Sequence, residues 1–112
     1  MNDFKFKKDC RPLEKDIEAY HVRQVKTKLG GMSEKFTSPN KRSVPDRIDV
    51  LPCSILNFVE LKRPGEKPTH LQAKDHAKRR ALGHRVYVID TKEGVDAYIK
   101  EMQEEIELLS LL

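Results

Sequence analysis

The sequence predicts an α/β fold, a mixed β-sheet flanked by helices in the order α-β-β-β-α-β-α. Apolar residues recur at helical spacing near both ends of the chain, and runs rich in β-formers lie between them. The last of these runs follows a predicted helix, so its strand must return to the sheet by a crossover. The 112 residues allow one domain with one modest core, which we take to be residues 1–112.

The first predicted helix follows a short charged segment. Residues 1–10 read as a loose arm, and Pro12 suits a first helical turn. The helix is predicted over 12–29 and ends at Gly30-Gly31. Its apolar face comprises Leu13, Ile17, Tyr20, Val25 and Leu29.

Three strands are predicted next. A short strand over 32–37 leads into 38–45, a basic loop rich in turn residues. Strands over 47–51 and 55–62, separated by a short turn, should pair as an antiparallel hairpin.

The second half of the chain predicts a helix, a strand and a helix. A basic helix is expected over 69–82, with the apolar residues Leu71, Ala77, Ala81 and Leu82 available for the core. The apolar run 85–90 predicts a central strand buried on both faces. The last helix is predicted over 92–109.

Charge is unevenly distributed along the chain. Residues 1–92 hold 21 Lys and Arg against 12 Asp and Glu, whereas 93–112 hold one Lys against six acids. A basic body suits a polyanionic partner, nucleic acid first, although a merely soluble basic protein would have the same composition.

Other classes of protein are disfavoured. No apolar run approaches the roughly 20 residues of a membrane span. Residues 1–10 lack an apolar signal core, so we expect a cytoplasmic protein, in a bacterial host if it is phage-encoded. The histidines and cysteines lack zinc-site spacing, and there is no glycine-rich phosphate loop. No small-molecule cofactor is expected.

Three charged residues lie where strand propensity would not place them. Glu60 and Lys62 share one face of their predicted strand, and the hairpin can bring Asp46 beside them. Neighbouring carboxylates repel each other unless a cation lies between them, and hard oxygen ligands favour Mg²⁺ or Mn²⁺. Such a metal with Lys62 suits phosphodiester hydrolysis. The alternative is a solvated strand face with a weak ion pair. Asp49 is out of phase with Asp46, so we expect a structural or surface role.

The segments VPDRIDV (44–50) and FVELKRPGEKPTHLQ (58–72) resemble the PD-(D/E)xK nuclease superfamily, and more narrowly its virus-type replication-repair nuclease domain, VRR-NUC. The likeness extends over roughly 13–98 and includes GHRVYVID (83–90). The chain departs from it at Asn40 and Ser43, where the family's loop often has glycine. The resemblance implies a restriction-endonuclease-like fold and a metal-dependent nuclease.

The resemblance also implies individual roles. Asp46 and Glu60 match the metal-binding acids, and Lys62 matches the catalytic lysine. Glu14 matches the acid that commonly completes the metal site, with Glu18 one helical turn later as its rival.

Two further positions and a substrate follow from the same likeness. The carbonyl of Leu61 is an expected metal ligand, and Gln72 matches a catalytic-site residue that helps to hold phosphate or the lysine. Similar small proteins are homodimers that cut branched DNA, including four-way junctions. Cleavage of flaps, ends or plain duplex, and a non-catalytic DNA-binding module on the same fold, stay open as alternatives.

Two surfaces are candidates for partners. Phosphate contacts come mostly from Lys, Arg and hydroxyl groups. The candidates here are Lys35, Ser38, Lys41, Arg42, Arg47, Arg63, Lys74 and Lys78. The C-terminal leucines Leu108, Leu111 and Leu112 widen the last helix's apolar surface, which predicts a dimer contact or packing on its own sheet.

Overall fold

The structure, a computed structural model, describes residues 10–112. The helices are α1 (Glu14–Leu29), α2 (His70–Ala81) and α3 (Lys92–Ser110), and the strands are β1 (Met32–Lys35), β2 (Arg47–Leu51), β3 (Ile55–Leu61) and β4 (Val86–Ile89). The predicted order of elements is therefore confirmed. The expected loose arm falls on residues 1–10, of which 1–9 lie outside the described part. No helix of the described part has the length and apolar character needed to cross a bilayer.

The four strands form one mixed sheet in the order β1-β2-β3-β4. The first three are antiparallel, and the predicted hairpin pairs Arg47 with Val59 and Leu51 with Ile55. Strand β4 adds in parallel to β3 after the chain has crossed through α2. The prediction that this last strand is central was wrong, because the crossover adds it to the sheet edge, where Val88 is 40% exposed.

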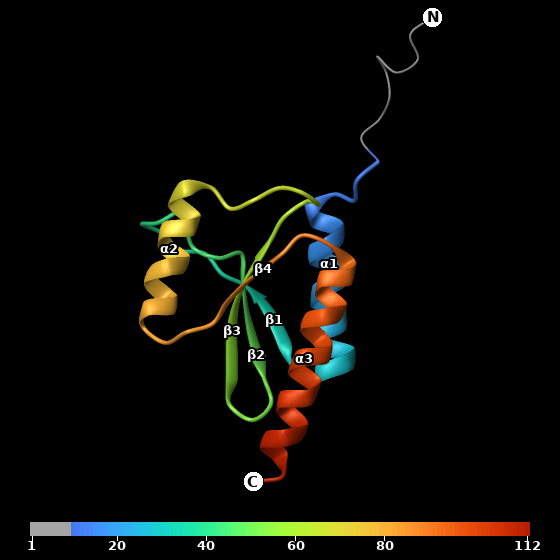
Figure 1. Cartoon of the computed structure of the whole chain (residues 1–112). Helices are drawn as coiled ribbons and strands as arrows, with labels where there is room; N and C mark the ends of the chain where they lie inside the picture. Colours follow the sequence, from blue (N-terminus) through green and yellow to red (C-terminus); the bar gives the residue numbers. More distant parts are fainter. Residues whose placement is uncertain (1–9) are drawn as a thin grey trace, which may run out of the picture.

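The hydrophobic core lies on one face of the sheet, under α1 and α3 (Figure 1). Alternate residues of β3 point into it, and its members include Ile17 of α1, Val59 and Leu61 of β3, and Met102 of α3. Side chains alternate along a strand, so Phe58 and Glu60 point to the opposite face. That second face is the one on which α2 lies (Figure 1).

Helix α2 is attached to the sheet through polar side chains. Its buried residues are Asp75 and His76, whereas Leu71 is 65% exposed and Leu82 is 79% exposed. The expectation that the leucines and alanines of this helix supply core was therefore wrong. The helix is oriented so that the side chains that contact Glu60 and the 38–45 loop face the sheet.

A buried polar cluster crosses the core between α1, the hairpin and α3. Asp49 is fully buried and accepts from Tyr98 at 2.7 Å, and its Oδ2 lies 2.7 Å from His21 Nε2. Asn57, opposite Asp49 in the sheet, donates to the Tyr98 hydroxyl at 2.9 Å. Asp49 is thus structural and not on the surface.

Candidate active site

Asp46 and Glu60 meet because of the hairpin register. Arg47 pairs with Val59, so Asp46 lies one position earlier, opposite Glu60 and on the same face. The Asp46 Oδ2 atom accepts from the backbone N–H of Leu61 at 2.8 Å, and its backbone oxygen accepts from Phe36 at 2.9 Å. These contacts fix the first acid at the point where the basic loop joins the sheet.

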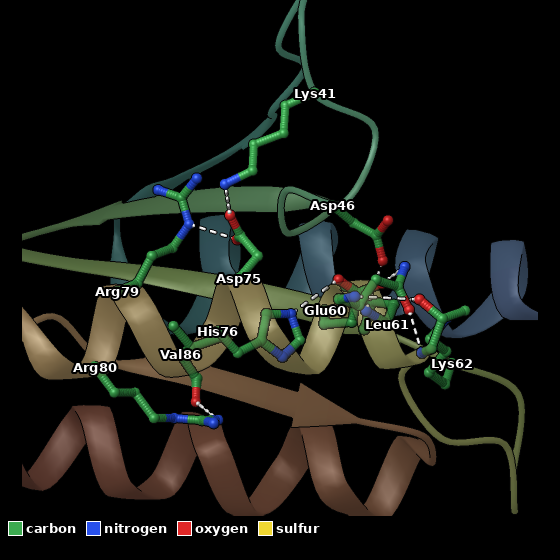
Figure 2. Close-up of polar contacts among 12 residues, drawn as sticks. Lys41, Asp46, Glu60, Leu61, Lys62, Asp75, His76, Arg79, Arg80 and Val86 are labelled. Carbon is green, nitrogen blue, oxygen red and sulfur yellow. Dashed lines mark hydrogen bonds and ion pairs between the residues drawn. The ribbon is translucent and has the colours of Figure 1, made fainter.

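Glu60 is almost fully buried, and side chains of α2 and the nearby Lys62 surround its carboxyl group (Figure 2). Its Oε2 accepts from Gln72 Nε2 at 3.1 Å and lies 3.8 Å from Lys62 Nζ. Its Oε1 lies 3.3 Å from His76 Nε2. Burial and the nearby Arg80 lower the pKa of His76, which favours a neutral ring. In the tautomer with its proton on Nε2, that ring donates to Glu60.

The electrostatics of the acid pair are unusual for carboxylates. Burial first, then the charge of Asp46 and a hydrogen bond shared with it, raise the pKa of Glu60 to about 8, and Lys62 offsets part of this. Glu60 therefore holds a proton near neutral pH, which relieves its repulsion with the neighbouring carboxyl group of Asp46. A cation between them would remove the repulsion that keeps this proton in place.

Two acids on α1, Glu14 and Glu18, are candidates for the third acid of this site. Burial and then Asp46 raise the pKa of Glu14, which places Glu14 within the same electrostatic group. Glu18 instead accepts from Arg47 Nη1 at 2.8 Å. The geometry therefore favours Glu14 over Glu18 as the partner of Asp46.

A cleft of about 390 Å³ opens beside Asp46. Both glutamates of α1 line it, together with four of the eight expected DNA contacts, namely Lys35, Ser38, Lys41 and Arg42. A second cleft, of about 200 Å³, lies between the loop and α2 and includes Lys74 and Lys78. Lys41 lines both clefts, so one basic track runs from the acids to α2.

The remaining two expected DNA contacts are engaged within the protein. Arg47 donates to Glu18 and through Nε to the Ser33 hydroxyl at 2.9 Å. Arg63 donates to the carbonyl of Pro12 at 3.3 Å and so ties the start of α1 to the end of β3. Both arginines therefore connect the segments that surround the site.

The donor set suits a hard divalent cation, although it is not fully assembled. Asp46 and Glu60 supply adjacent carboxylate oxygens, the chemistry that Mg²⁺ and Mn²⁺ prefer. Within residues 10–112, no three His, Cys, Asp or Glu side chains converge closely enough to hold a metal ion. The acid pair therefore fits such a cation by the chemistry of its oxygens.

Two residues of the site were missed from the sequence. His76 contacts Glu60, and Asp75 accepts from Lys41 Nζ at 2.7 Å and from Arg79 Nε at 2.8 Å (Figure 2). Burial would raise the pKa of Asp75, but these two cations hold it below its usual value. The signal was the polar spacing 72, 75, 76 and 79, which places one polar stripe along α2.

Comparison with known proteins finds a relative in sequence and a similar solved structure. "Putative nuclease p44" from Acyrthosiphon pisum secondary endosymbiont phage 1 is 49% identical over 80 residues, which cover 71% of this chain and 85% of that protein. A solved structure titled "VRR_NUC domain" superposes with a TM-score of 0.74 at 28% identity and covers 78% of this chain and 94% of its own. No family model matches the chain.

Proposed function

Because the chain belongs to the VRR-NUC family of nucleases, we propose that it is a Mg²⁺- or Mn²⁺-dependent endodeoxyribonuclease that cuts branched DNA such as four-way junctions. The observation that carries the proposal is the pairing of the half-buried Asp46 with the buried Glu60 beside Lys62, at the edge of a cleft lined by basic residues. A module that only binds DNA has no need of two carboxylates in contact, because each repels phosphate.

The cation would be held by Asp46 and Glu60, with Glu14 and the carbonyl oxygen of Leu61 completing its protein ligands. A divalent ion there would polarise the scissile phosphate and lower the pKa of a bound water. Lys62 orients the attacking water or offsets the negative charge that develops on the phosphate. Its place 3.8 Å from Glu60 and on the same strand face supports this role.

The DNA strand follows the basic track from the acids over the 38–45 loop to α2. Lys35, Ser38, Lys41 and Arg42 contact phosphates next to the cut, and Lys74 and Lys78 contact phosphates further along. The phage origin of the relative p44 supports action on DNA inside a bacterial cell.

A homodimer would suit a branched substrate. Two sites related by a two-fold axis can make paired cuts on a symmetric junction. The C-terminal end of α3 supports this assembly, because Leu108, Leu111 and Leu112 are 67%, 78% and 100% exposed in the single chain.

The test is cleavage mapping on end-labelled junction, flap, free-end and plain duplex substrates, with Mg²⁺, Mn²⁺ or chelator. We expect cuts near the junction centre that require the metal. The variants Glu60→Gln and Lys62→Ala should lose cleavage by a factor of at least about 100 while retaining DNA binding. Cleavage in chelator would overturn the metal dependence. Equal cutting of plain duplex would overturn the branched specificity.

A further inference from the structure

We propose that His76 is a positioning residue that, with Gln72, fixes the carboxylate of Glu60 in the orientation the reaction requires. The proposal rests on the proposed function and adds a residue that the motif does not include. It concerns the way in which α2 takes part in a site whose acids lie on the sheet and the loop.

The geometry gives each carboxylate oxygen its own partner. Gln72 Nε2 donates to Oε2 at 3.1 Å, and His76 Nε2 lies 3.3 Å from Oε1. The two residues are four apart and therefore lie on the same face of α2, one turn from each other. Two contacts from one helix fix both the rotation and the tilt of the carboxylate plane, which a single contact cannot do.

Gln72 is itself held in place. Its Oε1 accepts from the backbone N–H of Thr69 at 2.9 Å, and the Thr69 hydroxyl accepts from the backbone N–H of Gln72 at 3.2 Å. This capping box starts the helix and fixes the side chain that reaches Glu60. The start of α2 is therefore set by the same residue that contacts the acid.

The burial of His76 argues against a role in packing alone. It is 1% exposed, although the same helix leaves two leucines in solvent. A helix that only needed to cover the sheet would place those leucines inward, because a buried imidazole must be hydrogen-bonded to offset its desolvation. The sequence instead buries the side chain that reaches Glu60.

The partners of Glu60 leave the carboxylate able to bind a cation. Each carboxylate oxygen has two lone pairs; Gln72 donates to one of Oε2, and His76 with its proton on Nε2 donates to one of Oε1. Groups that orient a metal ligand in this way typically change metal affinity by 10- to 100-fold when they are removed. The expected consequence of losing His76 is therefore a weaker metal site in a folded protein.

The experiment compares His76→Leu, His76→Gln and the control His70→Leu in the full chain. His70 lies on the same helix but is exposed, so its substitution controls for the loss of an imidazole from α2. The glutamine amide can place its nitrogen near the position of Nε2. Mn²⁺ affinity is measured by calorimetry, folding by thermal unfolding, and cleavage by kcat and KM.

We expect His76→Leu to bind Mn²⁺ roughly tenfold more weakly and to lower kcat with little change in the KM for DNA. His76→Gln should recover most of both, and His70→Leu should match the wild type. In a Glu60→Gln background, His76→Leu should cause no further loss of Mn²⁺ affinity.

The proposal is overturned if folded His76→Leu binds Mn²⁺ as the wild type does, or if its loss persists undiminished in the Glu60→Gln background. If His76→Leu does not fold, the same two criteria apply to His76→Asn, whose shorter amide does not reach Glu60. A wild type that neither cleaves DNA nor binds Mn²⁺ would instead overturn the proposed function.

Discussion

At the scale of single residues, Glu60 places a carboxyl group where the fold would be more stable without its charge. The pKa of Glu60 is about 8 in the folded protein, against 4.5 for an ordinary glutamate side chain, so the folded state keeps the proton of Glu60 to higher pH. Between these values the unfolded chain loses the proton first, and stability therefore falls as pH rises. Above pH 8, Glu60 is charged in both states, and the loss of folding stability reaches its full size.

We therefore predict that Glu60→Gln makes the metal-free protein more stable than the wild type at pH 8 to 9. The difference should shrink as pH falls toward 4.5, since both side chains are then neutral. Thermal unfolding in chelator across this range measures it, with Glu104→Gln, exposed on α3, as the control. Parallel curves for wild type and Glu60→Gln would contradict the assignment.

Asp75 gives a pH dependence of the opposite sign. Its pKa is lowered by Arg79 and Lys41 against the effect of burial, so its contribution to stability is present above the usual aspartate range and is lost as pH falls through the lowered value. Asp75→Asn should destabilise the protein by about 1.5–3 kcal/mol at neutral pH, the range for hydrogen bonds to charged groups. It should also release the 38–45 loop, read out as faster tryptic cleavage after Lys41 and Arg42. Unchanged cleavage would show that another contact holds the loop.

At the scale of elements, the connection between α1 and β1 depends on two adjacent glycines for different reasons. Gly30 has φ +67° and open space around it, whereas a Cβ on Gly31 would lie 2.7 Å from the carbonyl oxygen of Val50. Gly31→Ala should lower the free energy of unfolding by about 1–3 kcal/mol, because the backbone must move to make room for the methyl group. Gly30→Asn should be close to neutral, since asparagine tolerates the left-handed region. Urea denaturation measures both variants, and equal losses would contradict this distinction.

The elements were predictable because local pattern decides them. Alternation defined the hairpin, and helical periodicity defined α1 and α3, whose apolar faces do enter the core. The same reasoning failed for α2 because it assumes that a helix is oriented by its leucines. Here Gln72, Asp75 and His76 orient the helix, and their partners lie 12 to 34 residues away along the chain.

The candidate site was predictable to the extent that it is built from strand register. Alternation places Glu60 and Lys62 on one face, and the hairpin places Asp46 opposite Glu60. The choice between Glu14 and Glu18 was not predictable, because one helical turn separates them. The ion pair of Glu18 with Arg47 and the proximity of Glu14 to Asp46 distinguish them only in the folded protein. The roles of Asp75 and His76 likewise depend on the approach of α2 to the sheet.

At the scale of the whole molecule, the proposed dimer makes a direct prediction. Replacing Leu108, Leu111 and Leu112 together with serine should convert a dimer into a monomer without loss of folding, because these side chains are exposed in the single chain. Sedimentation velocity measures the change, and Leu82→Ser, an exposed leucine on α2, is the matched control. A wild-type protein that sediments as a monomer would contradict the assembly.

The polar attachment of α2 also has a consequence for local unfolding. A helix held by a few hydrogen bonds, with its leucines in water, can detach at a small part of the free energy that unfolds α1 and α3. Its backbone amides should therefore exchange with deuterium well before those of the two core helices. Mn²⁺ should slow that exchange, because a cation on Glu60 stabilises the arrangement that Gln72 and His76 hold. The face of the sheet that carries Glu60 and α2 would then become rigid only when the divalent cation is bound.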